Sequence, residues 1–235
     1  MFDKKFENIK NIDEKFKKSV GEFAEEILKA NPNRISSICV YGNRNILVAL
    51  NDEEDFDFFC KNSKTVKKFH KKNIISLFIT KKHIQTSQDV FPLEFLDIKK
   101  SCQLIYGDDF CCEININMEN LRLQAEQQIK GLLIRFYQLL LEIGDDKRKI
   151  RDMINNSLDT IFAVFRGMVF LKQNKYLIDK NEILDELKKN FGIDLITIKE
   201  ILNKAKRNEK YDQKILNSFI KELQDFAYLV DGVKL

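Results

Sequence analysis

SSICVYGN (residues 36–43) and DVFPLEFLDIKKSCQLIYGDD (residues 89–109) are the two stretches that decide the fold of this chain. The first is an apolar run that ends in a Gly turn, a pattern that predicts a buried strand. In the second, we expect a strand over residues 90–96 that carries Glu94, then a short helix, then a strand over residues 102–106 closed by Gly107. Both stretches are therefore expected to belong to one sheet.

Apolar periodicity predicts the other elements. Steps of three and four predict an amphipathic helix over residues 2–30, or two shorter helices if Asp13 starts a new turn, and residues 46–50 and 74–79 are predicted strands. From Met118 onward long helical patterns replace the strands. We therefore expect an α+β protein, with a mixed-sheet domain and its flanking helices over residues 1–115 and an all-α bundle over residues 116–235.

The composition is that of a soluble globular protein of 235 residues, 44% hydrophobic and 32% charged. The net charge of +4 comes from 40 basic and 36 acidic residues that are well mixed, so nucleic-acid binding is not expected. The charged N-terminus predicts no signal peptide, and no apolar run approaches the roughly 20 residues of a membrane span. We expect a cytoplasmic protein without membrane contact.

The five cysteines include no CxxC pair, so a zinc site is not expected. Cys39 and Cys102 lie in apolar strand patterns, where cysteine acts as a small hydrophobe. Cys111 and Cys112 are adjacent, and a disulfide between neighbours is strained. We expect all five thiols to be reduced.

A Gly turn followed by spaced carboxylates is the pattern that phosphate chemistry needs. The turn lets backbone amides approach a phosphate, and two carboxylates at spacing two on one strand point to the same side and can share magnesium. Here Gly42-Asn43 is followed, after eleven residues, by Asp55-Phe56-Asp57.

Residues 40–43, 89–109 and 120–135 resemble nucleotidyltransferases of the DNA polymerase β superfamily, in the bacterial branch where this domain precedes a helical one. The resemblance implies a mixed five-stranded sheet and Mg²⁺-dependent transfer of a nucleotidyl group from an NTP. It also implies the site: Asp55, Asp57 and Glu94 as catalytic residues and metal ligands, Asp97 as a further ligand, and Gly42, Asn43 and Arg44 as the nucleotide-binding turn.

Two registers fit this pattern. In the literal one, Asp55 and Asp57 lie on the second strand and bind metal. In the other, residues 45–50 are that strand, because they are the best strand candidate nearby, and Asn43 and Asn45 stand where acids belong. Residues 51–54 then begin a helix capped by Asn51, with Phe56, Phe59 and Cys60 on its inner face. We favour the second register, which leaves a degenerate metal site.

Other charged residues have competing interpretations. Glu94, expected on a strand, needs a partner if buried: a basic side chain or a metal. Asp97 is placed either to bind metal or to cap the short helix that follows it. Arg135 and Arg166, among apolar helix residues, either receive phosphate or pair with Asp152 or Asp159.

Three functions compete. The favoured one is a nucleotide-binding or regulatory module that has kept the fold and lost the activity, working through a protein partner or as a homodimer. The alternative is an active Mg²⁺-dependent nucleotidyltransferase that moves NMP from an NTP to a hydroxyl acceptor. The third is an RNA-binding module, which the small net charge does not favour.

Overall fold

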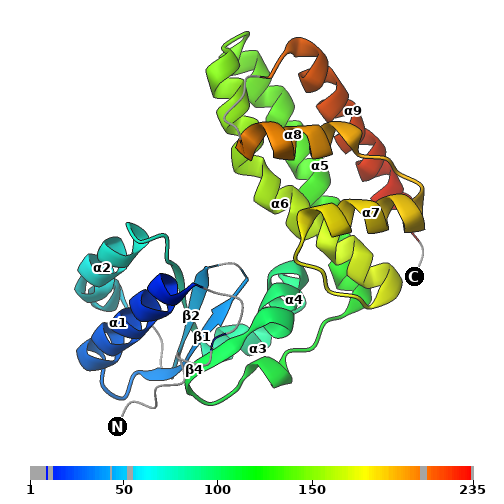
Figure 1. Ribbon diagram of the computed structural model, residues 1–235. Helices are drawn as coiled ribbons and strands as arrows, with labels where there is room; N and C mark the ends of the chain where they lie inside the picture. Colours follow the sequence, from blue (N-terminus) through cyan, green and yellow to red (C-terminus); the bar gives the residue numbers. More distant parts are fainter. Residues whose placement is uncertain (1–8, 10–12, 43, 52–54, 207–210, 234–235) are drawn as a thin grey trace. The chain divides into compact units, whose positions relative to one another are not determined.

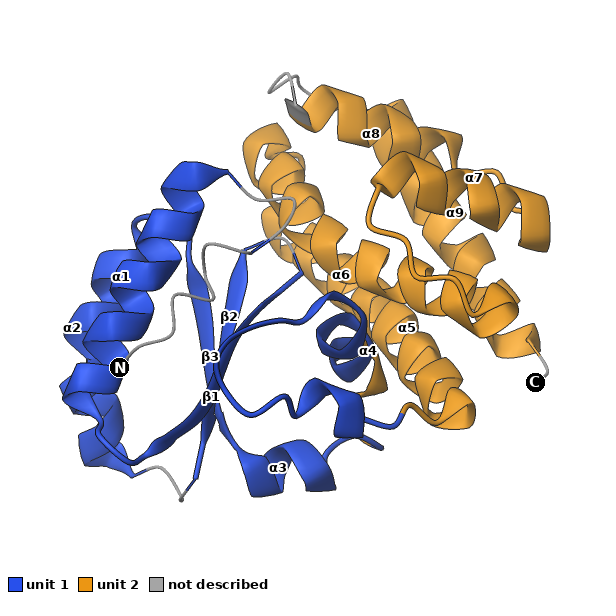
Figure 2. Cartoon of the chain, turned by 60° about the horizontal axis from the view of Figure 1, so that its bottom comes forward, with its two compact units in different colours: residues 1–89, 94–115 blue, residues 90–93, 116–235 orange. Residues whose placement is uncertain are grey.

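The computed structural model describes residues 9, 13–42, 44–51, 55–206 and 211–233 (Figure 1). The chain divides into two compact units (Figure 2). The first, the sheet unit, consists of Met1–Asp89 and Glu94–Asn115, and the second, the helical unit, of Val90–Leu93 and Ile116–Leu235. Each unit is described by itself below.

The sheet unit contains a four-stranded mixed sheet in the order β3-β2-β1-β4. β1 pairs antiparallel with both β2 and β4, whereas β2 and β3 are parallel. The predicted α+β class is confirmed, as are four of the five predicted strands. The elements are α1 (Glu14–Ala30), β1 (Ile35–Tyr41), β2 (Asn45–Leu50), α2 (Phe56–His70), β3 (Ile75–Thr80), α3 (Lys81–Thr86), α4 (Pro92–Ser101), β4 (Gln103–Gly107) and a 3-10 turn (Cys111–Glu113).

The core of this unit lies between the sheet and the helices α1 and α2, which cover one face (Figure 2). The Phe23 ring of α1 stands edge-on to that of Phe69 of α2 at 5.5 Å, and both are fully buried. Alternate strand residues supply the sheet side of the core, among them Ile38, Val40, Ile46, Val48 and Leu50. Because neighbouring residues of a strand point to opposite faces, Cys39 and Leu47 face away from α1 and α2.

The strand predicted over residues 90–96 is wrong, because this segment belongs to the helix α4. Pro92 occupies the first helical position, where its fixed φ and missing N–H favour a helix start. Leu93, Phe95, Leu96 and Ile98 are all buried, which does not fit the alternating burial of a strand with one covered face. Short apolar runs of this kind do not distinguish a buried strand from a helix.

The helices α1 and α2 begin later than predicted. Asp13 caps α1 by accepting a hydrogen bond from the Phe16 N–H at 2.8 Å, so a helix does start there, as the two-helix alternative expects. Residues 2–8 and 10–12, where its first helix would lie, are outside the described part of the chain. α2 is capped by Asp55, not Asn51. Its inward face consequently carries Phe58 and Phe69, while Phe56 is 80% exposed, so the predicted inner face is wrong.

The described part of the helical unit is built of helices, as the sequence predicts. α5 packs against α6 and α9, α6 also against α7, and α8 against α9. No helix in the described ranges is long and apolar enough to cross a membrane. The helices are α5 (Met118–Ile143), α6 (Lys147–Gln173), α7 (Lys180–Phe191), α8 (Ile196–Lys206) and α9 (Gln213–Gly232).

Candidate functional site

The Gly42 turn joins β1 to β2 and is held by the C-terminal end of α4. Tyr41 and Asn45 pair across the hairpin, and Gly42 has a left-handed φ of 57°, which favours glycine. Its N–H donates to the Ser101 hydroxyl at 2.7 Å, and this hydroxyl donates in turn to the Asp97 carbonyl at 2.5 Å. The amide predicted to meet a phosphate therefore already has an acceptor within the protein.

Arg44 lies beside α1. Its guanidinium donates to the Asp13 carboxylate at 2.9 Å and stacks over the Phe16 ring at 5.2 Å from the centroid. The side chain remains 42% exposed. Asn43, the third predicted nucleotide-binding residue, lies outside the described residues. Arg44 is thus accessible to an anion, but an anion must compete with Asp13.

The acids of α4 lie near the end of β1. Burial raises the pKa of the Tyr41 phenol to about 12, and the nearby carboxylates of Asp97 and Glu94 add to this effect. Asp97 is half-buried and Glu94 is exposed, in the first turn of the helix. Glu94 is thus an exposed helix residue, and the expectation that it sits on a strand is wrong.

Asp55 and Asp57 lie at the N-terminus of α2. The Asp55 carboxylate accepts a hydrogen bond from the Phe58 N–H at 2.7 Å and lies 3.9 Å from the Arg34 guanidinium. Asp57 is exposed in the first turn. Residues two apart on a helix do not face each other, so these two carboxylates are not arranged as they would be on a strand.

The strands themselves carry no carboxylate. β1 (ISSICVY), β2 (NILVAL), β3 (ISLFIT) and β4 (QLIYG) contain neither Asp nor Glu. Asn45 and Leu47 of β2 pair with Ile75 and Leu77 of β3, so the central strands present amide and apolar side chains. Within the described ranges, no three carboxylates come within 4.8 Å of one another; the one group of metal-ligating side chains that does is made of cysteines. The acids that the structure describes do not fit a two-magnesium site.

Two features of the sheet unit could not be predicted from the sequence. Ser101 falls in the predicted short helix after Asp97, and its contact with Gly42 spans 59 residues, so no local pattern reports it. Cys102 and Cys111 form a disulfide, with their Cα atoms 6.6 Å apart, so the expectation of a fully reduced chain is wrong. Two cysteines nine residues apart do not match a recognised motif, so their spacing does not predict the disulfide.

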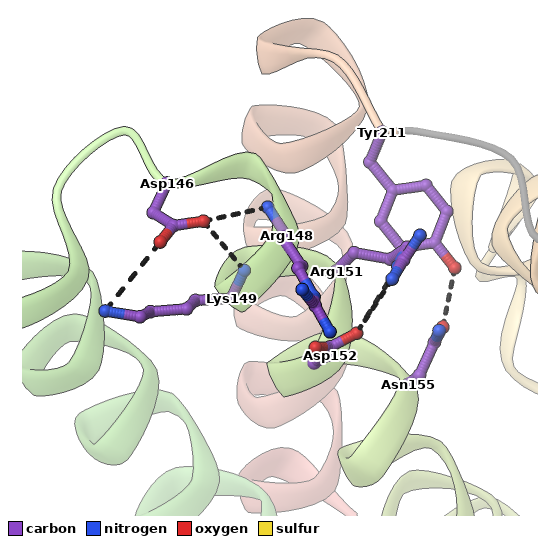
Figure 3. A network of polar contacts seen from close by, with 7 residues as sticks. All are labelled: Asp146, Arg148, Lys149, Arg151, Asp152, Asn155 and Tyr211. Atoms are coloured by element: carbon purple, nitrogen blue, oxygen red, sulfur yellow. Dashed lines mark hydrogen bonds and ion pairs between the residues drawn. The ribbon is translucent and has the colours of Figure 1, made fainter.

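The helical unit has a hollow of its own, between α5 and α6, with a volume of about 440 Å³. Arg135 and Asp152 both line it. Figure 3 shows the polar network at the N-terminal end of α6, where the Arg151 guanidinium donates to Asp152 at 3.2 Å and the Tyr211 hydroxyl donates to Asn155 at 2.6 Å. Asp152 thus has a partner other than the predicted arginines.

The remaining predicted arginine pairing also differs. Asp159 accepts from Lys180 at 2.8 Å, while the Arg166 guanidinium donates to the Leu177 carbonyl at 2.9 Å and stacks over Tyr176. In these contacts the side chain of Arg166 fastens the segment that follows α6. These are contacts within the helical unit.

The fold has a counterpart among solved structures. The chain is similar to the spectinomycin adenyltransferase AAD(9) from Enterococcus faecialis, whose crystal structure contains ATP and spectinomycin, with a TM-score of 0.59 over 91% of this chain and 99% of that one. The fold is nucleotidyltransferase-like. The two sequences are only 12% identical, so the likeness establishes the fold alone. No protein-family model matches the chain, and no curated protein matches its sequence.

Proposed function

We propose that this protein keeps a nucleotidyltransferase-like fold without the transfer activity and works as a nucleotide-binding or regulatory module. The observation that supports this most directly is the absence of Asp and Glu from all four strands of the sheet. Nucleotidyl transfer relies on two metal ions that clamp the attacking and leaving oxygens, and magnesium takes oxygen ligands, chiefly carboxylates.

The two acids predicted to follow the Gly turn lie at the start of a helix. Asp55 caps α2 through the Phe58 N–H, and Asp57 is exposed in the next turn. Asn45 begins β2 where the favoured register expects an acid, and a neutral amide lacks the charge to hold two divalent ions. Asp55 and Asp57 lie at the N-terminus of α2. A magnesium site that joined them with Glu94 and Asp97 of α4 would therefore need α2 to rearrange.

A nucleotide could still be held by the turn between β1 and β2. The adenyltransferase of similar fold was crystallised with ATP, and the left-handed Gly42 and the accessible Arg44 are the remnants of such a site here. Because the turn has no carboxylate ligands for magnesium, Mg²⁺ should not raise its affinity for a nucleotide. As a regulatory module, the protein would report nucleotide occupancy to a protein partner or to a second copy of itself, in the cytoplasm.

The decisive test is a transfer assay with labelled ATP and GTP, Mg²⁺ and a panel of hydroxyl-bearing acceptors. We expect no release of pyrophosphate above the protein-free rate, for the wild type and for a double Asp55→Asn/Asp57→Asn variant alike. Turnover by the wild type that the double variant loses would overturn the proposal and establish the active, magnesium-dependent enzyme.

Calorimetric titration with ATP and GTP tests the binding half of the proposal. We expect the same affinity with Mg²⁺ and with a chelator, and a loss of about tenfold in Arg44→Ala, the size of one charge-assisted contact to phosphate. Arg148→Ala, which removes an exposed arginine from the helical unit, is the matched control and should bind like the wild type. If the protein binds neither nucleotide, only a role in binding a protein partner or a second copy of the chain remains.

A further inference from the structure

Three sulfur atoms gather on the face of the sheet opposite to α1 and α2. Cys39 lies on β1, Cys102 directly before β4, and Cys111 in the 3-10 turn that follows β4. Their Sγ atoms all lie within 4.8 Å of one another. Cys102 and Cys111 are joined as a disulfide, and Cys39 beside them is a free, fully buried thiol.

The pairing of β1 with β4 creates this cluster. Cys39 pairs with Leu104 and Val40 with Gln103, which places Cys39 beside the start of β4. The chain then turns back after β4, where the Asp109 carboxylate accepts a hydrogen bond from the Cys111 N–H at 3.0 Å and fixes this cysteine. Since the three cysteines are far apart or irregularly spaced in sequence, the spacing rules that exclude a zinc site do not apply.

We propose that, once the disulfide is reduced, Cys39, Cys102 and Cys111 bind one thiophilic divalent ion, with zinc as the best match. Three thiolates select soft or borderline ions and not magnesium or calcium. With Zn²⁺ they leave one net negative charge, whereas Cu⁺ leaves two. Burial penalises net charge, so this largely buried site favours the divalent ion.

The geometry needs only a local adjustment. A Zn–S bond of about 2.3 Å and tetrahedral angles place sulfurs about 3.8 Å apart. Cys39 is already within 4.8 Å of the other two, and after reduction Cys102 and Cys111 have to separate from bonding distance. Their Cα atoms, 6.6 Å apart, stand near the wide end of the range of about 4.4–6.8 Å for disulfides, which leaves room for this change.

The chemistry balances with a dithiol as reductant. The dithiol transfers two electrons and two protons to the Cys102–Cys111 disulfide and becomes a disulfide itself. The ion then displaces three protons to solvent as three metal–sulfur bonds form, and water or the Asp109 carboxylate completes the tetrahedron.

The consequence is a metal site that depends on redox state. In the reduced protein the ion would join β1 to both ends of β4, and oxidation of Cys102 and Cys111 would remove two ligands and release it. The inference does not depend on the proposed nucleotide role, because none of its ligands belongs to the Gly42 turn.

Zinc titration of the full-length protein tests this inference. The protein is reduced with a phosphine, freed of metal, and titrated with Zn²⁺ against a chromophoric chelator, with Co²⁺ as a spectroscopic substitute. We expect one ion per chain and sulfur-to-cobalt charge-transfer absorption. Cys39→Ser and Cys102→Ser should each weaken zinc binding by at least about 100-fold. Cys60→Ser and Cys112→Ser remove the two exposed free cysteines and should bind like the wild type.

A second measurement on the unmodified chain guards against variants that fail to fold. The reduced wild type is alkylated with and without zinc, and the labelled cysteines are identified by mass spectrometry. Zinc should protect Cys39, Cys102 and Cys111 and leave Cys60 and Cys112 reactive. The inference is overturned if the reduced protein binds no zinc, if zinc protects only exposed cysteines, or if the disulfide resists reduction while the protein stays folded.

Discussion

The two halves of the sheet differ in what they place on the face away from α1 and α2. The β2–β3 half, where a nucleotidyltransferase would hold its acids, presents Asn45, Leu47 and Leu77. The β1–β4 half gathers three sulfurs around Cys39. The opposite face carries apolar core residues in both halves, among them Ile38, Val48 and Ile105. Under the two proposals above, the face away from the helices has lost one chemistry and gained another.

The largest expected effect comes from the core that both halves share. Phe23→Ala removes a fully buried ring that contacts Phe69 and Phe78 edge-on, and should destabilise the sheet unit by about 3–5 kcal/mol. Phe56→Ala removes an exposed ring and should change the free energy of unfolding by less than about 0.5 kcal/mol. Urea denaturation measures both, and equal effects would show that the core is not where we place it.

The next effect should fall on the β1–β4 half alone. An added Cβ at Gly107 would lie 1.8 Å from the Ser36 carbonyl oxygen, and its φ of 78° is unfavourable for any side chain. Gly107→Ala should therefore cost about 2–3 kcal/mol and also weaken zinc binding, because it disturbs the pairing that places Cys39.

The matched control for this change is Gly131→Ala. Gly131 lies within α5 and has open space where a Cβ would go, so alanine should stabilise the protein by about 0.5–1 kcal/mol through helix propensity. A Gly107→Ala protein as stable as the wild type, with its zinc affinity intact, would contradict the assigned role of β4.

The sequence predicts most of the fold and only part of the site. Periodicity locates four strands and the long helices because their apolar patterns extend over whole elements. It fails at residues 90–96, where a short apolar run with a proline suits either a strand or a helix. It also misses two contacts, that of Ser101 with Gly42 and that of Cys39 with Cys111. Strand pairing, and not local spacing, brings these residues together.

The third prediction concerns the acids that the literal register assigns to metal. Asp55→Ala should lower the free energy of unfolding by about 1 kcal/mol, the usual contribution of an N-cap. Asp57→Ala should lower it by only a few tenths of a kcal/mol, because it removes a charge that interacts with the helix dipole. Neither loss should depend on Mg²⁺. Thermal unfolding with and without Mg²⁺ measures both, and a magnesium-dependent stabilisation that both variants lose would return the two acids to a shared metal site.

The smallest expected effect lies where the two halves meet, at the Gly42 turn. Ser101→Ala removes the acceptor of the Gly42 N–H, and because this amide is exposed, water replaces the hydroxyl at a cost of about 0.5–1 kcal/mol. Ser63→Ala is the matched control. It removes a helical serine whose hydroxyl, like that of Ser101, donates to a carbonyl of its own helix, so it measures the part of the stability change that comes from helix propensity.

Hydrogen exchange at the Gly42 amide gives this last comparison its sharpest readout. Exchange should accelerate in Ser101→Ala and stay unchanged in Ser63→Ala, since only the first frees the donor. If the freed amide then binds ATP more tightly than the wild type does, Ser101 occupies the position of a phosphate oxygen and blocks the remnant of a nucleotide site. If the affinity does not change, the turn serves only to fasten α4 to the sheet.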